Sequence, residues 1–263
     1  MHTAIRAMMG VALAAMTAGG CAATDSPANA DGLALERVVF VMRHGIRPPT
    51  KDPAKGTNYA SDPWPAWPVD YGLLTPRGAA GIRLLGTADR AEYVKRGLIP
   101  ADGCLAPGAV DVEASAKQRA IKTGEAYLET LLPGCVVAVA HPEKEGPEDA
   151  IFHPLDSGPA DFDGARGHAE ALALAPAGGM AAEADAYRRE IDLLGTILGC
   201  CSATVCAAND AGAACTLADL PTTLAAHPHD RPDLEGPLAI GSTISQTLLL
   251  EYLEGMPMRD VGW

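Results

Sequence analysis

The sequence predicts an α/β fold that carries a second, smaller and mostly helical unit. Three short runs are typical of strands, with the first and third rich enough in valine to be buried: 35–42, 109–114 and 135–140. An alanine-rich, mostly helical block covers about 155–230 and interrupts this pattern. We therefore expect an α/β domain over 31–154, a helical insert over 155–230 and a return to the α/β domain over 231–263.

The helices of the α/β part have recognisable starts and ends. Thr75-Pro76-Arg77-Gly78 places a threonine N-cap before a proline at the first helical position, so a helix is expected from here through Arg96, ending near Gly97. Apolar residues close to helical spacing or helix-capping residues predict further helices over these ranges: 115–132, 187–198, 212–224 (capped by Thr216) and 241–255.

Composition bounds the class of protein. The chain has 263 residues, of which 48% are hydrophobic, and this is enough apolar material for a folded core. Its formal net charge is −13, which argues against nucleic-acid binding, because such binders need basic surfaces to neutralise phosphates. A small phosphate ester stays compatible with an acidic protein, since a local arginine cluster is enough to attract it.

The first thirty residues, 1–30, are typical of a targeting segment. Arg6 supplies the positive start, and residues 7–20 form an apolar stretch too short to span a bilayer as a helix. Two cleavage sites compete. Processing before Cys21 would leave a lipidated cysteine that tethers the protein to a membrane, and cleavage after Ala28-Asn29-Ala30 would release it. Both predict an exported protein, in the periplasm or held at the outer membrane as a lipoprotein.

The first predicted strand ends in a turn that carries unusual chemistry. Gly45 and Pro48 stop the strand, and open α/β sheets place ligand sites where parallel strands end. Arg43 and Arg47 flank His44 in this turn. Two guanidinium groups suit a phosphate dianion, because each binds its oxygens bidentately. The imidazole between them would then face the anion as a nucleophile.

These residues resemble a known family. Arg43-His44-Gly45-Ile46-Arg47-Pro48-Pro49 resembles the Arg-His-Gly-x-Arg-x-Pro signature of the histidine acid phosphatases. The resemblance runs from about residue 36 to the last residue, and three segments tie it to the bacterial periplasmic phytases and glucose-1-phosphatases: Pro49-Thr50-Lys51, Trp64 to Val69, and Leu74 to Gly78. It implies a phosphoglycerate-mutase-like three-layer sheet domain with an inserted smaller α-helical domain, and the C-terminal part of the sheet missing.

The resemblance also assigns roles. His44 would attack phosphorus and form a phosphohistidine intermediate. Three arginines would neutralise the phosphate: Arg43, Arg47 and Arg119. The residues after the signature turn, Thr50 and Lys51, are expected substrate contacts. The implied activity is hydrolysis of a small phosphate monoester at acid pH, with phytate or a sugar phosphate as substrate, no cofactor, no metal and a monomeric state.

The resemblance implies that the proton donor is not present in this chain. In the family, a His-Asp pair directly after a late buried strand supplies this acid, and we expect the chain to end before that strand. His229-Asp230 is not expected to replace it, because no apolar strand precedes the pair. Gln246 stands where related enzymes tend to carry an acidic residue near the substrate pocket. The choice between phytate and a sugar phosphate as substrate therefore stays open.

Two alternatives to a hydrolase stay open. A non-catalytic phosphate-binding lipoprotein would keep the arginines and lack the proton donor. A phosphotransferase or mutase of the wider superfamily would pass the phosphoryl group to a second sugar instead of water. Export and the Pro49-Thr50-Lys51 segment argue against the mutase.

Export makes the cysteines candidates for disulfides. The resemblance implies two bridges, Cys104–Cys135 and Cys206–Cys215. Cys200 and Cys201 have no partner in the family pattern, and adjacent cysteines are not expected to bridge each other, because the geometry is strained. A metal site is the alternative for these two, although no histidine lies at ligand spacing from them.

Overall fold

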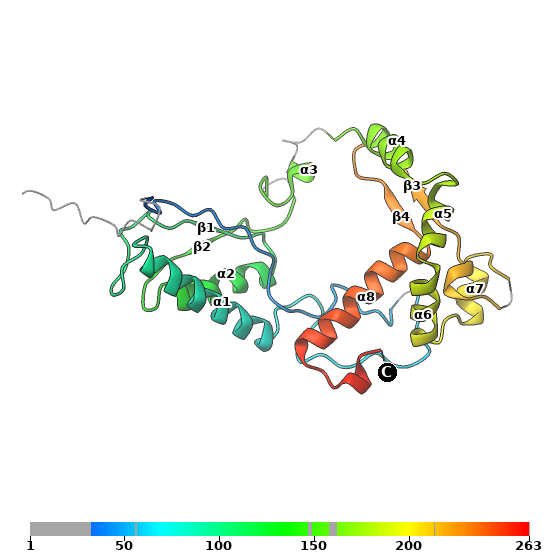
Figure 1. Ribbon diagram of the computed structural model, residues 1–263, viewed down its shortest axis with the longest axis horizontal. Helices are drawn as coiled ribbons and strands as arrows, with labels where there is room; N and C mark the ends of the chain where they lie inside the picture. The colour runs from blue at the N-terminus through cyan, green and yellow to red at the C-terminus, as the bar shows by residue number, and fades with distance from the viewer. Residues whose placement is uncertain (1–32, 56, 147–148, 158–161, 213, 263) are drawn as a thin grey trace, which may run out of the picture.

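The computed structural model describes residues 33–262, apart from 56, 147–148, 158–161 and 213. The predicted leader over 1–30, with Cys21, lies outside the described residues. Figure 1 shows two parts, one with two long helices beside a short pair of strands and one that is mostly helical. The arrangement agrees with the expected fold class, an α/β domain with a smaller helical one, whereas the domain boundaries 31–154, 155–230 and 231–263 stay a prediction.

The first part contains four elements: α1 (Pro76–Lys95), β1 (Val112–Glu113), α2 (Gln118–Leu131) and β2 (Val139–Ala140). The two strands pair in parallel, with Val112 opposite Val139. Helix α1 begins where the capping pattern predicts, since the Thr75 side chain accepts a hydrogen bond from the Gly78 backbone N–H. It ends at Lys95, one residue before the expected end.

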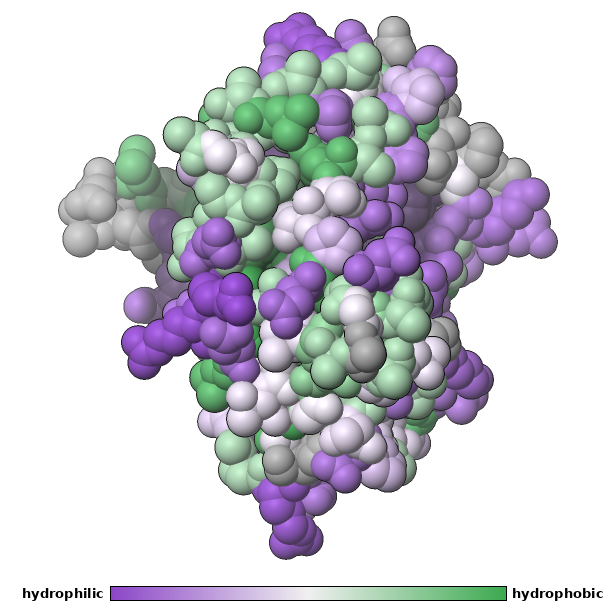
Figure 2. All heavy atoms as spheres, turned by 90° about the vertical axis from the view of Figure 1, so that its right-hand side faces the viewer, coloured by the Kyte–Doolittle hydropathy of each residue, from purple (hydrophilic) through white to green (hydrophobic). Residues whose placement is uncertain are grey.

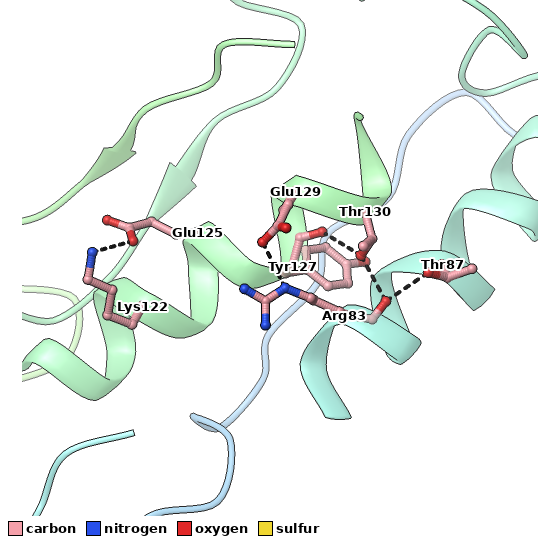
Figure 3. Close-up of polar contacts among 7 residues, drawn as sticks. All are labelled: Arg83, Thr87, Lys122, Glu125, Tyr127, Glu129 and Thr130. Carbon is pink, nitrogen blue, oxygen red and sulfur yellow. Dashed lines mark hydrogen bonds and ion pairs between the residues drawn. The ribbon is translucent and has the colours of Figure 1, made fainter. Parts of the chain in front are cut away.

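Helices α1 and α2 pack closely along their length. A buried apolar cluster lies between them and the strands: Ile82, Ile99, Ala126, Tyr127, Leu128, Leu131 and Leu132. Beside this cluster, Arg83 Nε pairs with Glu129 Oε2 at 2.8 Å, and Thr130 Oγ1 donates to the Arg83 carbonyl at 2.8 Å (Figure 3). Gly86 allows the close approach, because a Cβ there would lie 2.6 Å from the Tyr127 carbonyl oxygen.

The second part holds the remaining elements: α3 (Pro154–Ser157), α4 (Gly164–Leu174), α5 (Gly179–Ala186), α6 (Arg188–Leu198), α7 (Ala203–Ala208), the 3₁₀ turn η1 (Leu217–Asp219), β3 (Thr223–Ala225), β4 (Asp233–Glu235), α8 (Pro237–Glu254) and the 3₁₀ turn η2 (Met258–Asp260). Leu198 and Leu217 are fully buried in its core. Ala60 belongs to the same core, and Ser61 N donates to Leu198 O at 2.7 Å. The loop after the signature turn therefore reaches the helical part.

The first predicted strand, 35–42, is not a strand in the structure. Val39 and Val41 are 86% and 85% exposed, whereas the Phe40 ring stacks on Tyr127 with centroids 5.5 Å apart and Met42 packs on the same core. The run therefore alternates as an extended chain does. A strand also needs a hydrogen-bonded neighbour, and among the described residues none pairs with this segment.

Two further expectations are corrected. The third predicted strand, 135–140, is reduced to β2, with Val136 fully exposed before it, because β1 pairs with only two of its residues. The helix predicted over 212–224 is a single 3₁₀ turn, η1, followed by β3. Thr216 does cap the turn, since its N–H and hydroxyl both donate to Asp219 Oδ2, but Pro221 ends helical structure two residues later.

Three disulfides link the described cysteines. Cys104–Cys135 and Cys206–Cys215 have Cα atoms 5.6 Å apart, and both confirm the pairing implied by the resemblance. Cys200 and Cys201 are bonded to each other, so the expectation against a bridge between adjacent cysteines was wrong. Both side chains pack against the core of the helical part, where the nearby Cys206 and Cys215 already bond each other.

Among the residues that the structure describes, no helix is both long enough and apolar enough to cross a membrane. Figure 2 shows the side formed by the helical part as a mixture of hydrophilic and hydrophobic residues. Scattered apolar side chains are normal on a soluble surface, so this face alone does not indicate a partner.

The helix contact gives a stability prediction. Gly86→Ala should lower the free energy of unfolding by about 1–3 kcal/mol, because the added methyl meets the Tyr127 carbonyl and the Thr130 hydroxyl. Gly81→Ala on the same helix is the control, and it should stabilise by roughly 0.5–1 kcal/mol, since open space surrounds its Cβ position. Urea unfolding of both variants measures this, and equal effects would contradict the packing.

Candidate functional site

The His44 ring is held through both of its nitrogens. Nδ1 lies 2.8 Å from the Gly45 carbonyl oxygen, and Arg47 Nε donates to Nε2 at 3.2 Å. A carbonyl oxygen only accepts, so Nδ1 carries the proton and Nε2 keeps its lone pair. The neutral ring therefore has its nucleophilic nitrogen on the side of the arginine.

The surroundings of His44 favour this neutral state. Burial is the largest cause that lowers its pKa below 6.5, and the positive charges of Arg47, Arg119 and Arg43 lower it further. The hydrogen bond to Gly45 opposes them and raises the pKa. The net shift is downward, so the lone pair on Nε2 persists into moderately acid solution.

The structure brings the three predicted arginines to the histidine. Arg47 is buried, at 7% exposure, and Nη1 donates to the Pro48 carbonyl at 2.7 Å. Arg119, at the start of α2, donates from Nη1 to the Gly72 carbonyl at 3.4 Å. Arg43 is exposed. Burial and the charges of Arg119 and Arg43 lower the pKa of Arg47, which shows how close the three cations lie.

Helix α1 supports the signature turn from one side. Thr75 N donates to Ile46 O at 2.9 Å, and Gly45 sits against Gly78, whose carbonyl oxygen would lie 2.9 Å from a Cβ on Gly45. A side chain at Gly78 would in turn strike the Ile46 backbone. These two glycines are needed because the turn and the helix start touch backbone to backbone.

Helix α2 supports the turn from the other side. Gly45 N donates to Thr123 Oγ1 at 3.0 Å, and Thr123 is almost fully buried. In the next turn toward the N-terminus, Gln118 Oε1 accepts from Leu74 N at 3.0 Å. Thr123 and Gln118 were not among the predicted site residues. The signal that could have found Thr123 is its spacing of four residues from Arg119 on one face of α2, whereas Gln118 is only the first residue of that helix.

Helix α8 joins this assembly at its C-terminal end. Thr75 Oγ1 donates to Glu254 Oε2 at 2.7 Å, and Arg77 Nε donates to the Leu253 carbonyl at 2.8 Å. A cation at the last carbonyls of a helix is favourable, because the helix dipole leaves negative charge there. The first turn of α1 therefore connects the signature turn to the helix that closes the helical part.

The other predicted residues lie at different distances from this centre. Thr50 and Lys51 are exposed, and the Thr50 backbone lies beside Gly72, the residue to which Arg119 bonds. His229 and Asp230 are exposed in the loop between β3 and β4. Gln246 is exposed on α8.

No group of three metal-binding side chains gathers among the described residues. Cys200 and Cys201, the two for which a metal was the alternative, have their sulfurs in a disulfide. The positive charges that act on His44 are those of Arg47, Arg119 and Arg43.

Comparison with known sequences accounts for this arrangement. The sequence profile of the histidine phosphatase superfamily (branch 2) matches residues 34–162, which include the signature turn and α2. Phytase AppA of Escherichia coli (strain K12) is 34% identical over 237 residues, covering 88% of this chain and 53% of that protein. Glucose-1-phosphatase of Salmonella typhimurium is 30% identical over 234 residues, covering 89% and 54%.

The chain is thus similar to the histidine phosphatase superfamily, with the family match over residues 34–162. Solved structures agree: the phytase of Citrobacter braakii superimposes with a TM-score of 0.76 at 34% identity, covering 88% of this chain and 55% of that one. Hafnia alvei phytase in complex with myo-inositol hexakis sulphate gives 0.70 at 32% identity, covering 81% and 51%. The chain thus spans about half the length of the relatives it matches.

One buried carboxyl of this chain was not predicted. Glu251, one turn before Glu254 on α8, is fully buried, and neither of its carboxyl oxygens has a hydrogen-bond partner among the described residues. Burial raises its pKa to about 7. A helix pattern shows which face is buried, but a lone glutamate on that face gives no sign of whether it finds a partner.

Glu251 makes stability depend on pH. A pKa of about 7 in the fold against 4.5 in the unfolded chain favours the folded protein below pH 4.5, and this advantage is lost as the pH rises through 7. Glu251→Gln should therefore leave stability unchanged at pH 4 and raise it by roughly 2–3 kcal/mol at pH 8. Denaturant unfolding at both values measures this. The exposed Glu113→Gln is the control, and a gain equal at both pH values would refute the assignment.

Proposed function

We propose that this protein is a phosphomonoester hydrolase that works through a phosphohistidine on His44. The observation that carries the proposal is the neutral His44 ring, whose Nδ1 proton is held by the Gly45 carbonyl and whose Nε2 lone pair lies beside Arg47. A phosphate dianion repels nucleophiles until its charge is neutralised. The arginines provide that neutralisation next to a nitrogen that is ready to attack.

The reaction divides into two displacements. In the first, Nε2 of His44 forms a bond to phosphorus while the bond from phosphorus to the ester oxygen breaks, and the leaving alcohol takes up a proton. In the second, water displaces the histidine and releases inorganic phosphate. In the free site the Nε2 lone pair accepts a hydrogen bond from Arg47 Nε, so this bond has to be released before Nε2 attacks, and Arg47 can then donate to the phosphate oxygens instead. The proton for the alcohol is not assigned to any residue of this chain.

The substrate class follows from the relatives and from the exposed part of the site. The relatives named above are a phytase and a glucose-1-phosphatase, so a phosphate ester of a polyol or sugar is proposed here. Thr50 and Lys51 are exposed and follow the signature turn, so we propose that the rest of such a substrate extends over them. The charge of Lys51 suits an additional phosphate group. Export by the segment 1–30, with or without a lipid on Cys21, and a monomeric state belong to the same proposal.

Removal of the nucleophile tests the hydrolase. His44→Ala should lower turnover of phytate and of glucose 1-phosphate by at least about a thousandfold, because no second nucleophile replaces the ring. The exposed His229→Ala should retain full activity. After reaction with radiolabelled substrate, the wild-type protein should carry labelled phosphate and His44→Ala should carry none. The reaction is quenched in alkaline denaturant, because the N–P bond is labile in acid.

The same experiment separates the alternatives. If the protein binds phosphate but shows neither turnover nor a phosphate label, this result would support the phosphate-binding lipoprotein. Transfer of the label to a second sugar, with little free phosphate, would support a phosphotransferase or mutase. Either result would overturn hydrolysis as the function.

The charge of Arg47 should set the acid limit of the reaction. Burial and three cations lower the pKa of His44, so neutral His44, and with it kcat/KM, should persist below pH 6.5. Arg47→Gln removes one cation and should move the acid limb of the kcat/KM profile to higher pH, besides lowering its plateau. Arg83→Gln, which removes a distant surface ion pair, should leave the limb in place. An unmoved limb in Arg47→Gln would contradict the assignment.

A further inference from the structure

The residue whose carbonyl holds the nucleophile is itself held, at its own N–H, by a buried hydroxyl. Gly45 accepts the Nδ1 proton of His44 on its carbonyl, and its N–H donates to Thr123 Oγ1 at 3.0 Å. Glycine has wide rotational freedom about both backbone bonds, so its neighbours must determine where its carbonyl points. On one side this is the Gly78 carbonyl, which would lie 2.9 Å from a Cβ on Gly45, and on the other it is the Thr123 hydroxyl.

Thr123 is well placed to act as a fixed point. It is 3% exposed, and the residue after it, Gly124, packs so closely on the strands that a Cβ there would lie 3.0 Å from Val139. Threonine also has a β-branched side chain with few accessible rotamers in a helix, which limits motion of the hydroxyl. Arg119 lies one turn earlier on α2, so the same helix carries the third arginine and the hydroxyl that binds the Gly45 N–H.

We propose that Thr123 is a positioning residue for the nucleophile: by holding the Gly45 N–H, it keeps the Gly45 carbonyl on His44 Nδ1 and so determines which ring nitrogen is free to attack. The role as nucleophile rests on the function proposed above, whereas the choice of tautomer does not. Thr123 touches neither the reacting nitrogen nor the phosphate, and it acts through Gly45.

The physical consequence is a choice between two neutral forms of the ring. With the proton on Nδ1, the lone pair on Nε2 faces Arg47 and the phosphate site. Without the carbonyl, the ring can carry its proton on Nε2, which then has no lone pair for phosphorus. An enzyme whose histidine is held in the wrong tautomer loses rate even though its charge and position are kept.

The direct test is ¹⁵N NMR of the histidine rings in the whole protein, with the His44 signals assigned by their loss in His44→Ala. Wild-type His44 should show the Nδ1–H form, and finding the Nε2–H form would overturn the proposal without the need for any variant. Thr123→Val, which keeps the shape and removes the hydroxyl, should shift the ring toward Nε2–H. Thr123→Ser, which restores a hydroxyl, should keep the wild-type spectrum.

Kinetics provide the second readout. Thr123→Val should lower kcat roughly tenfold or more, the loss expected for one hydrogen bond, and Thr123→Ser should recover most of it. Thr130→Val is the matched control, because this threonine lies on the same helix and bonds the Arg83 carbonyl away from the site. If Thr123→Val keeps both the His44 tautomer and the kcat of the wild-type protein, the proposal is overturned. If wild-type His44 shows the Nδ1–H form but the protein has no turnover, the proposed hydrolase would be refuted. The role of Thr123 in selecting the tautomer would still stand.

Discussion

The site depends on the clasp around Gly45, formed where the signature turn lies between two helix starts. Gly78 of α1 touches it through its backbone, and Thr123 of α2 binds its N–H. The contact with Gly78 leaves no room for a side chain at Gly45, and the hydrogen bond to Thr123 needs α2 at the same place, so the turn, α1 and α2 have to be in place together. The tight packing of the two helices around Gly86 keeps them at this spacing and thereby keeps the turn in shape.

The electrostatics of the site follow from that clasp. An acidic chain with a formal charge of −13 gathers three guanidinium groups around one neutral imidazole. The cluster is stable because the arginines bond to backbone carbonyls, at Pro48 and Gly72, and the histidine gives up its proton more readily there than in water. The phosphate proposed above would supply the negative charge that such a cluster favours.

Part of this arrangement could be predicted before any coordinates. The cap at Thr75 and the family disulfides each depend on residues near one another in sequence or on a pattern shared with relatives, and each was confirmed. Residues 35–42 failed as a strand, because apolar alternation shows that a segment is extended but does not supply the hydrogen-bonded neighbour. The disulfide between Cys200 and Cys201 was missed because sequence spacing does not reveal which partner remains within reach.

The sequence by itself determined which groups the signature segment carries: two guanidinium side chains, one imidazole, and the glycine and proline that follow the extended run. Only the tertiary structure decided the state of that chemistry. The tautomer of His44, the contact of Thr123 with Gly45 and the isolation of Glu251 all arise between segments that are distant in the chain. The physical reason is that proton placement and pKa depend on burial and on hydrogen-bond partners, and both come from packing.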